Sequence, residues 1–85
     1  MKLDATEMTP VINRIKRAQG QLAGVLRMLE EGRDCEDVVT QLAAVSRALD
    51  RAGFAIIASG LQQCLADGAD SPDVKKMERL FLSLA

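Results

Sequence analysis

The sequence contains no histidine, tryptophan or tyrosine, and it has only two phenylalanines, two cysteines and two prolines. Without histidine a thiol enzyme would lack its base, and two cysteines alone are too few for a closed zinc site within one chain. We therefore expect no enzyme activity and no resident cofactor or metal. No apolar run is long enough to cross a membrane, and the polar segment before residue 9 has no apolar signal-peptide core. These absences predict a cytoplasmic protein that does not bind membranes.

The residues that are abundant are those of packed helices, namely Leu, Ala, Val, Ile, Met, Glu, Gln and Arg. The predicted fold class is therefore all-α. A chain of 85 residues forms one domain and buries only a modest fraction of its surface, so association between chains is expected to complete its core. We predict a single helical domain over residues 9–85, preceded by a flexible N-terminal arm at residues 1–8.

Three helices are predicted from the residues that start and stop them. Thr9 is a suitable N-cap before Pro10, and Gly32 is a good stop at the end of the same helix. Asp34 is placed to cap the second helix, Asp67-Gly68 marks its end, and Ser71-Pro72 opens the third. The expected helices cover about 10–31, 35–66 and 72–83.

Apolar residues recur in the first two helices at alternating gaps of four and three, the pattern by which helices pack on helices. Two long antiparallel helices with apolar residues on more than one face cannot cover themselves as a hairpin. Two hairpins are therefore expected to form an antiparallel four-helix bundle in a homodimer. The stripes are Val11, Ile15, Ala18, Leu22, Val25 and Leu29, and Val38, Leu42, Val45, Leu49, Ala52 and Ile56.

The two cysteines, Cys35 and Cys64, stand 29 positions apart within the predicted second helix. The rise of the helix separates them by roughly 40 Å, whereas a disulfide needs Cα atoms within roughly 7 Å. In an antiparallel dimer with a two-fold axis near Leu49 and Asp50, Cys35 of one chain would meet Cys64 of the other. Each dimer would then hold two equivalent dithiol sites.

Positive charge is concentrated in the first helix, because residues 8–29 include Arg14, Lys16, Arg17 and Arg27 and no Asp or Glu. Such a surface suits contacts with DNA phosphates, and a solvated helix face with ordinary ion pairs is the alternative interpretation. No helix-turn-helix signature is evident, so recognition of DNA shape and backbone is expected. The candidate DNA-binding residues are Arg14, Lys16, Arg17, Gln21, Arg47 and Arg51.

Three segments together resemble the copper-sensitive operon repressor family of bacterial transcriptional regulators: residues 12–21 (INRIKRAQGQ), 28–37 (MLEEGRDCED) and 41–45 (QLAAV). The resemblance covers about residues 10–84. It implies an all-α repressor that assembles as a dimer of dimers, a homotetramer, and binds operator DNA in its effector-free state. It also implies release from DNA when an inducer engages the cysteine site between protomers.

The departures from the family pattern concern the inducer. The family's copper sensors carry a histidine four residues before the second cysteine, where this chain has Gly60. Its nickel and cobalt sensors need several histidines, and its formaldehyde sensors rely on a proline at the position of Lys2. The chain therefore most resembles the persulfide-sensing branch, which keeps only the two cysteines. That resemblance implies reactive sulfur species, a persulfide or polysulfide, as the inducer.

The chemistry expected of the two thiols follows from their places in the helix. Cys35, at the positive end of the helix dipole, is the expected nucleophile toward a sulfane sulfur, and Cys64, at the negative end, is the expected resolving thiol. A competing inducer is Cu(I), bound by Cys35 and Cys64 in a two-coordinate site. Three further interpretations are a thiol enzyme with Cys35 as nucleophile, a purely structural helical assembly, and two buried cysteines that only fill the core.

Overall fold

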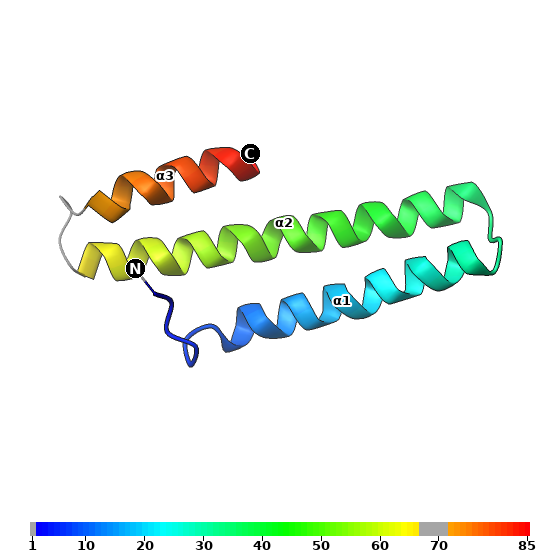
Figure 1. Cartoon of the computed structure of the whole chain (residues 1–85), viewed down its shortest axis with the longest axis horizontal. Helices are drawn as coiled ribbons and strands as arrows, with labels where there is room; N and C mark the ends of the chain where they lie inside the picture. The colour runs from blue at the N-terminus through cyan, green and yellow to red at the C-terminus, as the bar shows by residue number, and fades with distance from the viewer. Residues whose placement is uncertain (1, 67–71) are drawn as a thin grey trace.

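The computed structural model describes residues 2–66 and 72–85, which form three helices. α1 (Thr9–Glu30) and α2 (Cys35–Ala66) make an antiparallel hairpin, and α3 (Pro72–Leu84) returns along the C-terminal half of α2 (Figure 1). The described residues contain no strand, which confirms the all-α prediction. The predicted ends of the helices agree with the structure to within one residue. Asp67, Gly68 and Ser71, predicted to end α2 and to open α3, lie outside the described residues.

The start of α1 differs from the prediction in its cap. The N-cap position is occupied by Met8, without a side-chain cap, so the prediction that Thr9 caps the helix is wrong by one residue. The reason is a turn over residues 5–8, in which Asp4 Oδ1 accepts hydrogen bonds from the Thr6 amide at 2.9 Å and the Thr6 hydroxyl at 2.6 Å. The Thr9 hydroxyl then donates to the carbonyl oxygen of Thr6 at 3.1 Å. Flexibility of the arm in solution stays a prediction.

The turn between α1 and α2 depends on Gly32. Its φ of +68° lies in the left-handed region that favours glycine. The amide of Gly32 donates to the Leu29 carbonyl and the amide of Arg33 to the Met28 carbonyl, the two bonds of a Schellman motif. The next helix begins at once, because the Val38 amide donates to the carbonyl of Asp34, which places Asp34 at the predicted N-cap position.

Only alternate members of the two apolar stripes are buried between α1 and α2. The buried members are Val or Ala, each 8% exposed or less: Val11, Ala18 and Val25 of α1, and Val38, Val45 and Ala52 of α2. The members between them are Ile or Leu and are 39% to 61% exposed: Ile15, Leu22, Leu29, Leu42 and Leu49. We call these five residues the apolar face. A single chain therefore covers only half of each stripe.

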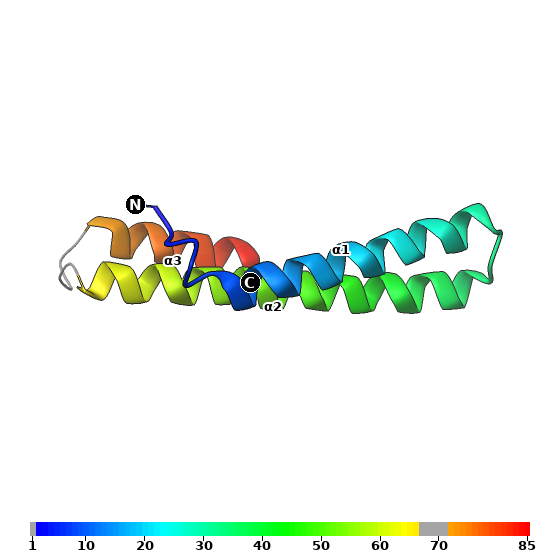
Figure 2. The same ribbon diagram turned by 90° about the horizontal axis from the view of Figure 1, so that it is seen from below.

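α3 packs on α2 through contacts that include an aromatic pair. The rings of Phe54 and Phe81 lie with their centroids 5.3 Å apart and their planes tilted by 52°. Near the end of α3, Leu84 fits against Gly53, where a Cβ atom would lie 2.8 Å from Leu84 Cδ1. The view in Figure 2 shows α1 and α3 along different parts of α2. Within the described part of the chain, α2 contacts both other helices, and α1 and α3 do not contact each other.

The resulting hairpin is elongated and flat, with principal extents of 53 × 26 × 12 Å. Of the helices described, none is both long enough and apolar enough to span a bilayer. A flat molecule of this shape has no deep interior, so its candidate sites lie in grooves between helices.

Candidate nucleic-acid interface and thiol site

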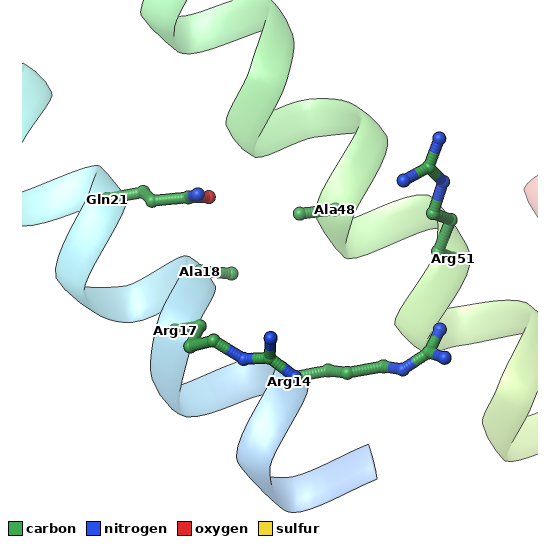
Figure 3. Close-up of a pocket in the computed structure, with 6 residues that line it drawn as sticks. All are labelled: Arg14, Arg17, Ala18, Gln21, Ala48 and Arg51. Carbon is green, nitrogen blue, oxygen red and sulfur yellow. The ribbon is translucent and has the colours of Figure 1, made fainter. Parts of the chain in front are cut away.

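Four of the six predicted DNA-binding residues come together in one cleft between α1 and α2. The cleft has a volume of about 360 Å³ and contains three guanidinium groups (Figure 3). It is lined by Arg14, Arg17, Ala18, Gln21, Ala48 and Arg51. We call it the arginine cleft.

The local sequence explains why these side chains meet. Arg14, Arg17 and Gln21 are spaced by three and four residues, which places them on one face of α1. Ala18 and Ala48 are small, so the two helices can approach closely here and Arg51 of α2 joins the α1 residues. In Figure 3 the side chains of Arg14 and Arg17 extend from α1 toward α2.

The cleft is electrostatically uncompensated. No carboxylate lines it, and the ion pairs formed within the described residues involve other side chains: Arg33 with Glu31 at 3.6 Å, and Lys76 with Asp73 at 3.5 Å. Within the residues described, no carboxylate therefore neutralises Arg14, Arg17 and Arg51, and their planar guanidinium donors are open to an external anion. Phosphate is one of the two anions, with carboxylate, whose geometry such a fork of donors matches.

The other two predicted residues lie elsewhere. Lys16 is one residue from Arg17, about 100° around the helix, and it borders an apolar hollow beside Leu3, Met8 and Ile15. Arg47 is exposed and does not line the arginine cleft. Contact of Lys16 and Arg47 with DNA stays a prediction.

A second groove adjoins the arginine cleft at Gln21 and was not predicted. Its volume is about 380 Å³, and its polar lining includes Arg27, Glu31, Arg33 and Gln41. The signal in the sequence was the continuing interval of three and four residues along α1, from Gln21 through Gly24 and Met28 to Glu31. The second groove continues along the same side of the hairpin.

The two cysteines lie at opposite ends of α2. Cys35 is the first residue of this 32-residue helix, and its thiol is free and exposed. The backbone of Cys64 belongs to the last turn of the same helix, about 44 Å along the axis at 1.5 Å per residue. A disulfide within one chain is excluded by this distance. Among the described residues, no three Cys, Asp or Glu side chains gather in a way that could hold a metal ion.

Comparison with known proteins gives sequence relatives that are named copper sensors. The chain is 33% identical over 67 residues to the copper-sensing transcriptional repressor CsoR of Bacillus subtilis, covering 79% of this chain and 66% of that protein. It is 36% identical over 69 residues to the copper-sensing repressor RicR of Mycobacterium tuberculosis, covering 76% and 72%. With CsoR of Mycobacterium ulcerans the identity is 42% over 55 residues, covering 65% and 47%. The matched region thus spans between about half and 72% of these relatives.

The fold has a solved counterpart in the nickel-responsive transcriptional regulator InrS. The TM-score is 0.70 at 26% identity, and the match covers 99% of this chain and 92% of InrS. Residues 7–83 also match the family described as metal-sensitive transcriptional repressors, whose members regulate transcription and are not enzymes. Since that match covers nearly the whole chain, this protein belongs to the family of metal-sensitive transcriptional repressors.

Proposed function

We propose that this protein represses transcription by binding operator DNA through the arginine cleft, and that an inducer acting on Cys35 and Cys64 releases it. The observation that carries the first part is that Arg14, Arg17 and Arg51 line one cleft and none of the described carboxylates lines it. Contacts to phosphates position a protein on DNA and supply most of its salt-dependent affinity. Binding to an operator implies that the protein works in the cytoplasm.

The apolar face supports the proposed homodimer. On α1, Leu22 and Leu29 border an apolar groove with Leu26, whereas Arg14, Arg17 and Gln21 border the arginine cleft. The two sets lie on opposite sides of the buried line through Ala18 and Val25. A second hairpin could therefore cover the apolar face in a four-helix bundle and leave the arginine cleft open to DNA. Pairing of such dimers would give the homotetramer and a wider basic surface.

Reactive sulfur is the first candidate inducer, and the thiol content of the chain supports it. The Cys35 thiolate would attack a sulfane sulfur of an inorganic polysulfide, breaking an S–S bond and expelling a shorter polysulfide. The Cys64 thiolate of the partner chain would then attack Sγ of the Cys35 persulfide, breaking its S–S bond and expelling the outer sulfur as hydrosulfide. Two thiols are oxidised to an inter-chain disulfide, and the polysulfide is reduced. The exposure of Cys35 at the start of α2 suits the first step.

Cu(I) is the second candidate inducer, and the names of the relatives support it more directly than they support reactive sulfur. Two thiolates from different chains are soft ligands that can hold Cu(I). Gly60 carries no donor at the position where the family's copper sensors have histidine. On this proposal the chain would use Cys35 and Cys64 alone.

A parallel treatment separates the two inducers. Reduced protein is bound to a duplex that it has selected from a pool of random sequences, and it is treated anaerobically with inorganic polysulfide or with Cu(I). Reactive sulfur predicts covalent dimers by non-reducing intact mass together with release of DNA, both lost in Cys35→Ala and Cys64→Ala. Cu(I) sensing predicts release by Cu(I) with no covalent link. If no selected duplex is bound at any salt concentration, the repressor proposal itself fails.

A further inference from the structure

The second groove extends the polar side of the hairpin from the arginine cleft toward the turn at Gly32. The two share Gln21, so they lie next to each other along the hairpin. Of the residues along the second groove, Arg27 and Arg33 are cationic and Glu31 is acidic. Arg33 is 3.6 Å from Glu31 and is partly neutralised by it, while Arg27 has no ion-pair partner in the described part of the chain. Arg27 is therefore the uncompensated charge of this groove.

The side chain of Arg27 extends back along α1 toward Gly24, in the direction of the arginine cleft. Side chains of a helix lean toward its N-terminus, and a guanidinium nitrogen of Arg27 lies 4.0 Å from the place where a Cβ of Gly24 would be. Apart from the backbone of α1 and the residues next to Gly24 in the chain, no other heavy atom of the described residues comes within 4 Å of that place, so the absence of a side chain at Gly24 leaves room for Arg27 over the helix. Its charge thus lies one turn beyond Gln21.

Resting on the proposed DNA binding, we infer that Arg27 is a further phosphate-contacting residue and that the duplex lies along the hairpin over both grooves. Arg14 and Arg27 are 13 residues apart, about 20 Å along α1. That is a little more than half of a DNA helical turn of about 34 Å. At this spacing the two guanidinium groups would contact different phosphates of one duplex. Contacts of this kind depend on the DNA backbone and not on base sequence.

The test measures the salt dependence of binding to a mixed-sequence duplex about three helical turns long by fluorescence anisotropy. Arg27→Gln is expected to weaken binding several-fold and to lower the slope of log K against log salt by about 0.9 for each lost phosphate contact. Lys75→Gln is the matched control, because it removes one exposed positive charge from α3 and should leave the slope unchanged. Circular dichroism checks that each variant is folded.

Gly24→Leu supplies a test that keeps the net charge. Leucine favours helix more than glycine does, so the variant should fold, and its side chain would fill the groove and displace Arg27. Weaker DNA binding by Gly24→Leu together with the Arg27→Gln result supports the inference. If both variants bind like Lys75→Gln while Arg14→Gln binds weakly, the inference is overturned and the arginine cleft stands. If Arg14→Gln also binds like Lys75→Gln, the proposed DNA-binding cleft is overturned as well.

Discussion

At the residue scale, the arginine cleft predicts that Arg51 and Arg47, two similar side chains, differ in their effect on DNA binding. Arg47 and Arg51 are both exposed arginines of α2, four residues apart, and Arg51 alone of the two lines the cleft. We expect Arg51→Ala to weaken DNA binding by about tenfold on every sequence and to lower the salt slope by about one, as for a lost phosphate contact. Arg47→Ala, which removes the same charge, should change both quantities much less. Equal effects of the two substitutions in an anisotropy titration would show that net charge alone controls binding.

A second residue-scale prediction concerns the turn before α1. The hydrogen bonds from the Thr6 hydroxyl and amide lower the pKa of Asp4 below its ordinary value, since they favour the carboxylate. Because the pKa is depressed in the folded turn, the stabilisation is complete above the unfolded pKa and is lost as pH falls through the folded one. We expect the Thr6 amide to be protected from exchange at neutral pH and to lose protection in acid. NMR titration of the Asp4 carboxyl carbon checks this, and a midpoint at the ordinary value for Asp would contradict it.

At the element scale, glycine substitutions in the turn at Gly32 and within α1 are predicted to have opposite effects on the free energy of unfolding. Gly32→Ala forces a side chain into the left-handed region and should lower the free energy of unfolding by about 1 kcal/mol. Gly20 lies in α1, and apart from the helix's own backbone and the adjacent residues no heavy atom of the described chain lies within 4 Å of the place for its Cβ. Gly20→Ala should therefore raise that free energy by about 0.5–1 kcal/mol. Denaturant titration of the two variants at equal protein concentration checks the signs. A Gly32→Ala variant as stable as the parent would mean that the turn can change its conformation.

The sequence predicted the helices well because their signals are local. Gly32 predicted the end of α1, Asp67-Gly68 predicted the end of α2, and Ser71-Pro72 predicted the start of α3, each to within one residue of the observed bound. The prediction that Thr9 caps α1 was wrong because the upstream turn, held by hydrogen bonds of Asp4 and Thr6, makes Met8 the N-cap residue. Which members of each apolar stripe face inward could not be predicted from periodicity, since both sets recur every seven residues. Packing decides it: the smaller Val and Ala side chains let α1 and α2 approach closely.

The residues of the candidate site that lie on α1 were predictable from sequence, and the residues of α2 that join them were not. Arg14, Arg17 and Gln21 follow from their spacing on α1 alone. Arg51 joins them and Arg47 does not because of the position of α2 along α1. This position depends on the length of the turn at Gly32 and on the packing of Ala18 against α2. The second groove was missed for the same reason, because Gln41 and Arg27 come together only in the folded hairpin.

At the scale of the whole molecule, the apolar face predicts that the chain does not remain a monomer. Leu22 and Leu49 are 48% and 44% exposed, an unfavourable exposure to water unless another chain covers them. Leu22→Glu or Leu49→Glu should shift the protein to monomer at concentrations where the parent is a dimer or tetramer. Asn13→Glu, at an exposed polar position of α1, is the matched control and should leave assembly unchanged. Sedimentation equilibrium measures the difference, and a monomeric parent protein would contradict the proposed bundle.

α2 also determines how one part of the molecule can affect another. Since α1 and α3 do not touch in the described part of the chain, a displacement of α3 reaches the arginine cleft only by moving α2. A continuous helix is stiff along its axis, so movement at one end is carried to the other as rotation or sliding of the whole rod. On the proposed function, a reaction at either cysteine of a chain would therefore displace Arg51 by changing the register between α1 and α2. On the proposed function, α2 both keeps the two thiols of one chain apart and connects each of them to Arg51 of the arginine cleft.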